Sequence, residues 1–179
     1  SSDVCSSDLG VPTILIFHLF SGRRRVGDCH WWLAQLGAHL LPGYAIKMIS
    51  IDTAIDRIHG DLSTGPNLTK ILQLARSGAV AASMTGPPCE TFSAARNIQL
   101  PDSAGPRPLR TREAPWCLAT SSDRELRQTA TGTELLMNSL QVEVATVGAG
   151  GGSLMEHPAE PNGEEKVSEI GRASCRERV

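Results

Sequence analysis

Short apolar segments that alternate with segments of helical spacing are the feature that most limits how this chain can fold. Thr13 to Phe20 reads TILIFHLF, a nearly continuous apolar run that is typical of a strand buried on both faces of a parallel sheet. Residues 26–41 carry apolar side chains at helical spacing, and residues 44–51 form a second apolar run that ends before Asp52. This order predicts the first strand, helix and second strand of a parallel sheet.

The same alternation continues to the far end of the chain. It predicts a helix over 67–77, a strand over 79–85, an irregular loop over 101–122, a helix from Asp123, as its cap, to about Val147, and a strand over 153–155. The long helix is expected to turn its large apolar side chains inward, namely Leu126, Leu135, Leu136, Leu140 and Val144. The predicted fold class is therefore α/β, with a mostly parallel sheet and helices on both faces.

Polar residues come directly after four of the predicted strands. They are Ser21-Gly22, Asp52, Cys89 and Glu156. In a parallel sheet, ligands bind beyond the carboxyl ends of the strands, so these residues converge on one edge. A glycine there permits close approach to the backbone, and an acid at the end of the second strand holds ribose hydroxyls. A cysteine can supply a nucleophilic thiolate, and a glutamate an acid.

Several of these residues lie in motifs that resemble those of the cytosine-5 DNA methyltransferases. Residues 86–93, GPPCETFS, resemble the family's Pro-Cys-Gln-x-Phe-Ser motif, with Glu90 in place of Gln. Leu19-Phe20-Ser21-Gly22 is similar to the start of the first motif, Leu-Phe-x-Gly. Further matches follow in the family's order, at Asp52, at Gly60-Asp61-Leu62 and at Met155-Glu156-His157-Pro158.

The resemblance implies a Rossmann-like S-adenosylmethionine-dependent methyltransferase fold that is truncated on its C-terminal side. It implies methyl transfer from S-adenosylmethionine to carbon 5 of a cytosine that is flipped out of double-stranded DNA. Cys89 would add to carbon 6 of the base, and Glu156 would protonate or hydrogen-bond N3. The residues that the resemblance assigns to the cofactor are Phe20, Ser21, Gly22, Asp52, Asp61 and Pro88.

Arginines are the residues of this chain that could meet the phosphates of DNA. The net charge is −2, so the chain has no overall basic footprint, but its arginines cluster locally. The residues expected to contact nucleic acid are Arg23, Arg24, Arg25 and Arg110, with solvated surface as the alternative. The arginine triplet stands where the family continues with glycines, and His157 stands where it has Asn.

The chain is expected to hold one partial domain between two foreign ends. Residues 1–9 and 170–179 resemble translated sequencing-adapter DNA, which leaves residues 10–169 as a partial methyltransferase catalytic domain. The family's Gln-x-Arg-x-Arg motif and target-recognition region are not found after Pro158. The fragment is therefore expected to be inactive alone.

Cysteine spacing and hydropathy limit the compartment and the partners. Cys29, Cys89 and Cys117 lie outside the two ends without CxxC spacing, which predicts neither a metal site nor a disulfide framework. No apolar run approaches the roughly 20 residues that span a bilayer, so no membrane partner is expected. An intracellular location follows, the nucleus in a eukaryote and otherwise the cytoplasm. The oligomeric state is left open.

Two other readings of the sequence remain. The first is a catalytically decayed methyltransferase-like domain of a retroelement polyprotein, which would keep the fold and some nucleic-acid binding. The arginine triplet and His157 favour it. The second is an unrelated nucleotide-binding α/β protein in which the Pro-Pro-Cys turn is coincidental.

Overall fold

The computed structural model of this chain describes residues 11–63, 65–93, 96, 106–111 and 113–157. The chain divides into two compact units. The sheet unit comprises Ser1–Thr85 and Gln141–Leu154, and the cysteine unit comprises Gly86–Leu140 and Met155–Val179. The elements in chain order are β1 (Thr13–Leu19), α1 (Cys29–Leu40), β2 (Ala45–Ile51), α2 (Gly65–Arg76), β3 (Val80–Thr85), α3 (Asp123–Gly148) and β4 (Gly152–Met155).

The strands form one parallel sheet in the order β2-β1-β3-β4, which confirms the predicted α/β class. β1 pairs with β2 from Thr13↔Ala45 to Leu19↔Ile51. On its other side β1 pairs with β3, ending at Leu19↔Thr85. The chain thus passes from one side of β1 to the other between β2 and β3. In sheets of this kind, such a reversal of strand order opens a crevice beyond the carboxyl ends of the strands.

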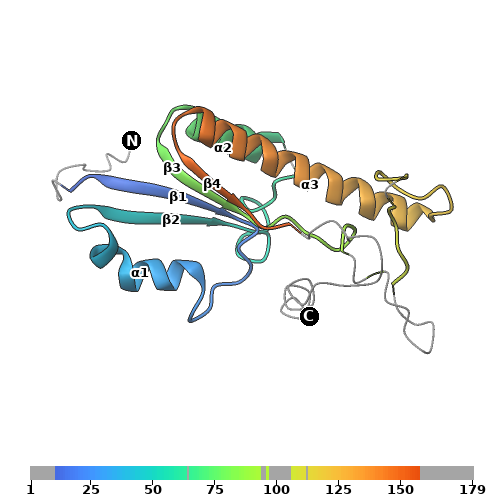
Figure 1. Cartoon of the computed structure of the whole chain (residues 1–179), viewed down its shortest axis with the longest axis horizontal. Helices are drawn as coiled ribbons and strands as arrows, with labels where there is room; N and C mark the ends of the chain where they lie inside the picture. The colour runs from blue at the N-terminus through green and yellow to red at the C-terminus, as the bar shows by residue number, and fades with distance from the viewer. Residues whose placement is uncertain (1–10, 64, 94–95, 97–105, 112, 158–179) are drawn as a thin grey trace. The chain divides into compact units, whose positions relative to one another are not determined.

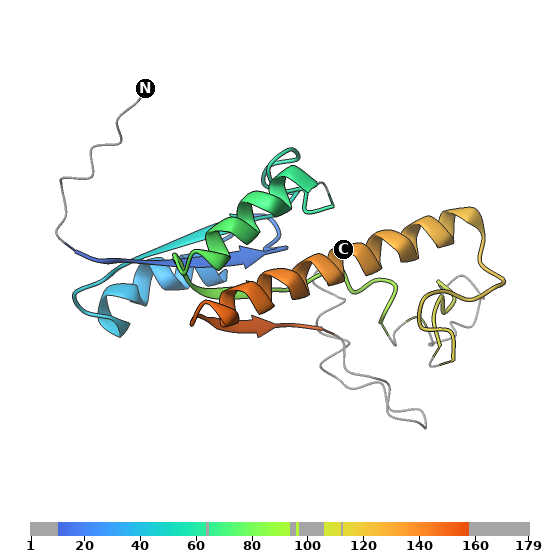
Figure 2. The ribbon, with the colours of Figure 1, turned by 90° about the horizontal axis from the view of Figure 1, so that it is seen from above.

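Helices cover both faces of the sheet within the sheet unit (Figures 1 and 2). α1 lies on one face, and α2 with the C-terminal part of α3 lies on the other. Gly37 of α1 packs so closely on β2 that a Cβ there would lie 3.1 Å from Cδ1 of Ile46. A small residue at this position lets the helix approach the strand.

The apolar core of the sheet unit follows the predicted strands. Phe17 and Leu19 of β1 are 1% and 0% exposed, and Val80 of β3 is equally well buried. On α2 the buried side chains are those of Ile71, Leu72 and Ala75, which recur at helical spacing. Burial of such side chains contributes about 1.5–3 kcal/mol each for a Leu, Ile or Phe.

All three predicted helix starts differ from the observed ones by one to three residues. α2 begins at Gly65 rather than at residue 67. At α1 and α3 the structure gives the reason for the difference. α1 begins at Cys29 rather than at residue 26, because the carboxylate of Asp28 accepts a hydrogen bond from the backbone N–H of Trp31 and caps the helix. At α3 the cap is Ser122 and not Asp123. The backbone N–H of Ser122 donates to the Glu125 carboxylate (2.8 Å), and the Glu125 N–H points back to the Ser122 hydroxyl (3.5 Å).

The predicted inward face of α3 is also wrong in part. Leu126, Leu140 and Val144 are exposed, Val144 by 70%, whereas Leu135 and Leu136 are partly buried. The buried face carries small and polar side chains instead, namely Thr129, Gly132, Asn138, Ser139, Val142, Glu143 and Thr146. Helical spacing shows which residues share a face, but not which face meets the rest of the protein.

Candidate functional site

The loops after β1 and β2 are tied together by one aspartate, as the sequence predicted for the edge of the sheet. The Asp52 carboxylate accepts hydrogen bonds from the backbone N–H of Gly22 (2.8 Å) and of Ala54 (2.7 Å). Phe20 leaves β1 in the left-handed region, with φ 57°, and its N–H donates to the Ile51 carbonyl. A non-glycine residue in that region is uncommon and is often found at ligand sites. The first two motif positions therefore lie side by side.

The third motif packs against the same turn. A Cβ on Gly60 would overlap the carbonyl oxygen of Asp52, so only glycine fits there. The carboxylate of the next residue, Asp61, accepts hydrogen bonds from the N–H (2.9 Å) and the hydroxyl (2.7 Å) of Ser63. Asp61 thus forms a turn beside Asp52, and its contact with a cofactor stays a prediction.

Cys89 lies in a tight turn that follows β3 and belongs to the cysteine unit. Its side chain is 7% exposed, and its carbonyl accepts hydrogen bonds from the N–H groups of Phe92 and Ser93, both at 2.9 Å. Glu90, the residue after Cys89, accepts a hydrogen bond from Nε2 of Gln128 at 3.2 Å. Pro88 lines a hollow of about 330 Å³ with residues of α3, among them Gly132 and Leu135. The turn is therefore held against α3.

Arg110 fastens this turn to the helix. Its guanidinium donates to the Thr91 hydroxyl (3.1 Å), to the Thr133 hydroxyl (2.9 Å) and to the carbonyl oxygens of Thr129 (2.7 Å) and Pro115 (2.8 Å). Burial lowers the pKa of the guanidinium from its ordinary value, and Cys117 raises it in part. Because four acceptors surround it, the structure gives Arg110 a positioning role, while contact with nucleic acid stays a prediction.

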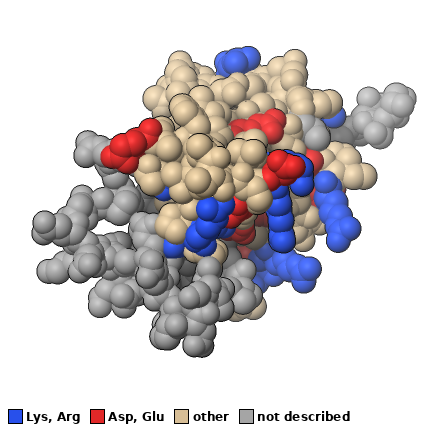
Figure 3. Space-filling model, turned by 90° about the vertical axis from the view of Figure 1, so that its right-hand side faces the viewer, with Lys and Arg blue, Asp and Glu red and all other residues tan. Residues whose placement is uncertain are grey.

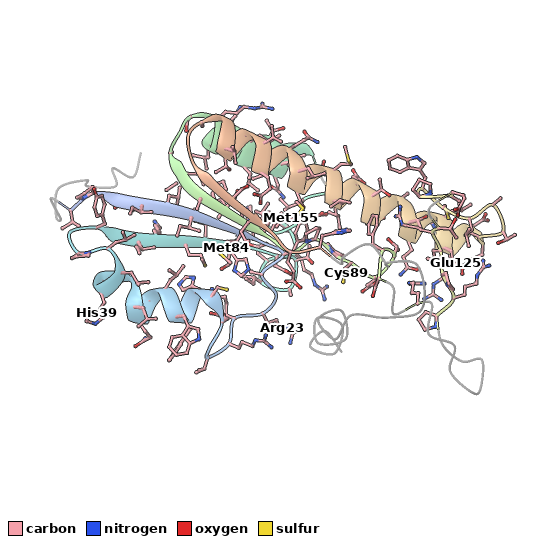
Figure 4. All side chains as sticks on the ribbon, in the orientation of Figure 1. Arg23, His39, Met84, Cys89, Glu125 and Met155 are labelled. Atoms are coloured by element: carbon pink, nitrogen blue, oxygen red, sulfur yellow. The ribbon has the colours of Figure 1, made fainter. Side chains whose placement is uncertain are left out.

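Phe92 joins the cysteine turn to the segment that carries Glu156. The Arg110 guanidinium lies 3.9 Å from the centre of the Phe92 ring, a cation–π contact. The other neighbour of the ring is His157, with centroids 5.0 Å apart and planes at 66°. Glu156 itself is exposed at the end of β4. Cys89 and Met155, the residue before Glu156, are labelled in Figure 4. Two motifs that are far apart in the sequence thus meet in one unit.

The arginine triplet after Gly22 does not act as one basic patch. The Arg24 guanidinium donates to the Ser50 hydroxyl (2.9 Å) and lies 3.8 Å from the Asp28 carboxylate. Arg23 is exposed and lines a different hollow, with Arg57. The face drawn in Figure 3 carries acidic as well as basic side chains among the described residues. Phosphate contact by the triplet stays a prediction, and the three side chains are not equivalent.

Sequence reasoning missed three groups that the structure makes prominent. They are the partners of Arg110 at Thr91 and Thr133, the arginine Arg57, and the buried acid Glu143. Only Glu143 carried a local signal, since it shares a helical face with Ser139 and Thr146 and stands between two valines.

Substitution of Gly132 by alanine tests how tightly the cysteine turn is packed on α3. A Cβ there would lie 2.8 Å from the Thr91 hydroxyl oxygen, which Arg110 holds in place. Alanine normally stabilises a helix interior by about 1 kcal/mol relative to glycine. Here we expect overpacking to dominate and the free energy of unfolding to fall by about 1–2 kcal/mol in urea denaturation. Gly148→Ala is the control, because a Cβ at Gly148 meets nothing within 4 Å. A gain in stability for Gly132→Ala would contradict the tight contact.

The described residues contain neither a metal-binding cluster nor a helix that could span a membrane. There is no group of three or more His, Cys, Asp or Glu residues that could hold a metal ion within the part of the chain that the structure describes. No helix in that part is both long and apolar enough to cross a bilayer.

Comparison with protein-family models, with curated proteins and with solved structures finds no match to this chain.

Proposed function

We propose that this chain is the methyl-transfer core of a cytosine-5 DNA methyltransferase. The observation that carries the proposal is the meeting of the Cys89 turn with the Glu156 segment through the Phe92–His157 ring contact, at 5.0 Å. A nucleophile and an acid must reach the same base for this reaction, so their two segments have to lie close together. The parallel sheet with β1 between β2 and β3 supports it further.

Cys89 is the proposed nucleophile. Its thiolate would form a bond to carbon 6 of a flipped cytosine, and the electron pair of the 5,6 double bond would move to carbon 5. Glu156 would donate a proton or a hydrogen bond to N3 of the ring, which stabilises the negative charge that develops. S-adenosylmethionine would supply the methyl group and leave as S-adenosylhomocysteine. Transfer of the carbon 5 proton to a base such as water would then restore the 5,6 double bond and release the Cys89 sulfur.

The loops of the sheet unit fit the ribose end of that cofactor. Each oxygen of the Asp52 carboxylate accepts one backbone hydrogen bond, from Gly22 and from Ala54, and each keeps a further lone pair for a hydroxyl donor. A Cβ built on Gly22 would meet nothing within 4 Å, so the backbone there is open to a ligand. Asp52 would hold the ribose hydroxyls, and Phe20 and Gly22 would line the cofactor.

Duplex DNA that contains 5-fluorocytosine tests this proposal. Fluorine replaces the hydrogen at carbon 5 and cannot be removed as a cation, so the enzyme stays covalently bound to the base. With S-adenosylmethionine present, and with a target-recognition region supplied in the same chain, we expect a covalent protein–DNA band that survives denaturing electrophoresis. The band should vanish in Cys89→Ala. It should persist in Cys117→Ala, the matched control, since Cys117 lies in a separate loop and contacts Ser121.

Each result bears on a different part of the proposal. A band that persists in Cys89→Ala would overturn the assignment of the nucleophile. Absence of the band together with absence of cofactor binding by calorimetry would overturn the methyltransferase. If DNA binding is retained in that case, the binding-only role of a decayed methyltransferase-like domain replaces it.

A further inference from the structure

Two arginine side chains line one hollow of the sheet unit. The hollow has a volume of about 620 Å³ and is lined by Arg23, Thr53, Ala54, Ile55 and Arg57. Arg23 comes from the loop after β1 and is labelled in Figure 4, and the other four residues come from the loop after β2. The hollow thus lies beyond the carboxyl ends of two adjacent parallel strands, where α/β sheets bind ligands. Its volume falls within the range of about 300–1,000 Å³ that is usual for ligand pockets.

The positive charges of this hollow are not paired within the part of the chain that the structure describes. Among the described residues, neither Arg23 nor Arg57 has an ion-pair or hydrogen-bond partner. Arg24 differs, because its guanidinium donates to Ser50 and lies near Asp28. Arg25 does not line the hollow. Two like charges on one wall repel each other unless an anion lies between them.

The two acids nearest in sequence are engaged elsewhere. The Asp52 carboxylate accepts from the N–H groups of Gly22 and Ala54. The Asp56 carboxylate accepts from the N–H groups of Ile58 and His59 and lies 2.8 Å from the His59 ring nitrogen. These hydrogen bonds, with that of the His59 N–H as the largest cause, lower the pKa of Asp56 to about 2. Both acids organise the loop instead of neutralising Arg23 or Arg57.

We propose that this hollow binds the phosphate group of a nucleotide, with Arg23 and Arg57 as its two cationic ligands. Guanidinium groups match phosphate oxygens with paired N–H donors, and the Thr53 hydroxyl adds a donor on the same wall. An arginine near the acid that ends the second strand is a known way to accommodate a phosphate on a ribose. The proposed ligand differs from the methyl donor, since S-adenosylmethionine carries no phosphate. The nucleotide is either free or part of a nucleic acid strand.

Calorimetric titrations with adenosine 5′-monophosphate and with adenosine separate phosphate recognition from base recognition. Fluorescence anisotropy with a single-stranded oligonucleotide that lacks terminal phosphates tests whether the hollow binds the backbone phosphates of a strand. We expect at least one phosphate-bearing probe to bind, and adenosine not to bind. Arg23→Gln and Arg57→Gln should each weaken binding by about tenfold. Arg25→Gln, a neighbour of the same type that does not line the hollow, should change it by less than about twofold.

The results identify the source of the phosphate or overturn the site. Binding of the monophosphate supports a free nucleotide. Binding of the oligonucleotide alone, with a salt dependence that falls by about one unit of slope in each of the two variants, supports a strand. Equal losses in Arg25→Gln, or no loss in Arg23→Gln and Arg57→Gln, would overturn the proposal, as would failure of both phosphate probes to bind. Cys89→Ala should leave phosphate binding unchanged, because Cys89 does not line the hollow. Failure of the methyltransferase proposal would therefore not alter this result.

Discussion

Replacement of Arg110 by methionine is expected to lower the free energy of unfolding by about 3 kcal/mol. The substitution keeps much of the apolar stem but removes every donor of the guanidinium. Four acceptors would lose their guanidinium donor, namely the hydroxyls of Thr91 and Thr133 and the carbonyl oxygens of Thr129 and Pro115. Thr91 and Thr129 are buried, so water cannot readily replace it. The cation–π contact with Phe92 would be lost as well.

Urea denaturation measures this loss, and alkylation of Cys89 shows where it acts. Because Arg110 holds Thr91 and Phe92, which follow Cys89 in the turn, the nearly buried Cys89 should react faster with iodoacetamide in Arg110→Met under native conditions. Arg110→Lys should recover little of the lost free energy of unfolding, since one ammonium group cannot reproduce the planar array of guanidinium donors. Arg124→Met is the control, because Arg124 is an exposed arginine of α3. Stability within about 0.5 kcal/mol of the original chain, with unchanged labelling of Cys89, would contradict the positioning role.

The strands of this fold could be predicted because their signal is local. The run from Ile14 to Leu19 is apolar at almost every position, and a strand buried on both faces needs just such a run. The observed bounds of β1, β2 and β3 differ from the predicted ones by a single residue at one end. At β1 that residue is Phe20, whose positive φ ends the strand, and no local pattern marks it.

The orientation of α3 could not be predicted, because it depends on partners outside the helix. Leu140 and Val144 are exposed, whereas Ser139 and Glu143, each next to one of them in sequence, are buried. A rule that buries the larger apolar side chain selects the wrong stripe here. Glu143 of α3 lies near the hydroxyls of Ser83 and Thr85 on β3, about 60 positions away in the sequence. No pattern within the helix predicts which of its faces meets such distant residues.

The candidate site divides in the same way. The link between Gly22 and Asp52 follows from topology, since residues at the carboxyl ends of neighbouring parallel strands lie close together. The contacts of Arg110 with Thr91 and Thr133 span 19 and 23 residues of irregular chain and helix, with no periodicity that would bring them together. Topology therefore predicts which loops meet, and only packing shows which side chains hold them.

Glu143 is a buried acid in the sheet unit, and it should make the stability of this chain depend on pH. Its side chain is 5% exposed, and neither carboxylate oxygen has a partner within hydrogen-bond geometry among the described residues. Burial raises the pKa of this carboxyl above its ordinary value, and the nearby hydroxyls of Ser153, Thr85 and Ser83 offset the rise only in part. The folded protein therefore favours the neutral acid.

The direction of the pH effect follows from this raised pKa. Below the ordinary carboxyl pKa of 4.5, Glu143 is protonated in both the folded and the unfolded chain, and burial costs least. As the pH rises, the unfolded chain ionises first, so the free energy of unfolding falls by up to about 1.4 kcal/mol per pH unit. The fall ends once the pH exceeds the raised pKa of the folded protein. Asp56 and Glu125, whose pKa values are lowered, act in the opposite direction and at more acidic pH.

Glu143→Gln removes the ionisable group while keeping its shape, so it should remove this fall. We expect the variant to be more stable than the original chain by about 1–2 kcal/mol at pH 8, and to lose that advantage near pH 4. Urea denaturation at intervals between pH 4 and pH 8 measures the difference at each pH. Glu134→Gln, at an exposed position of the same helix, should follow the original chain throughout. A constant difference between Glu143→Gln and the original chain over this range would mean that Glu143 ionises as readily in the folded protein as in the unfolded one. Its burial would then not control the proton.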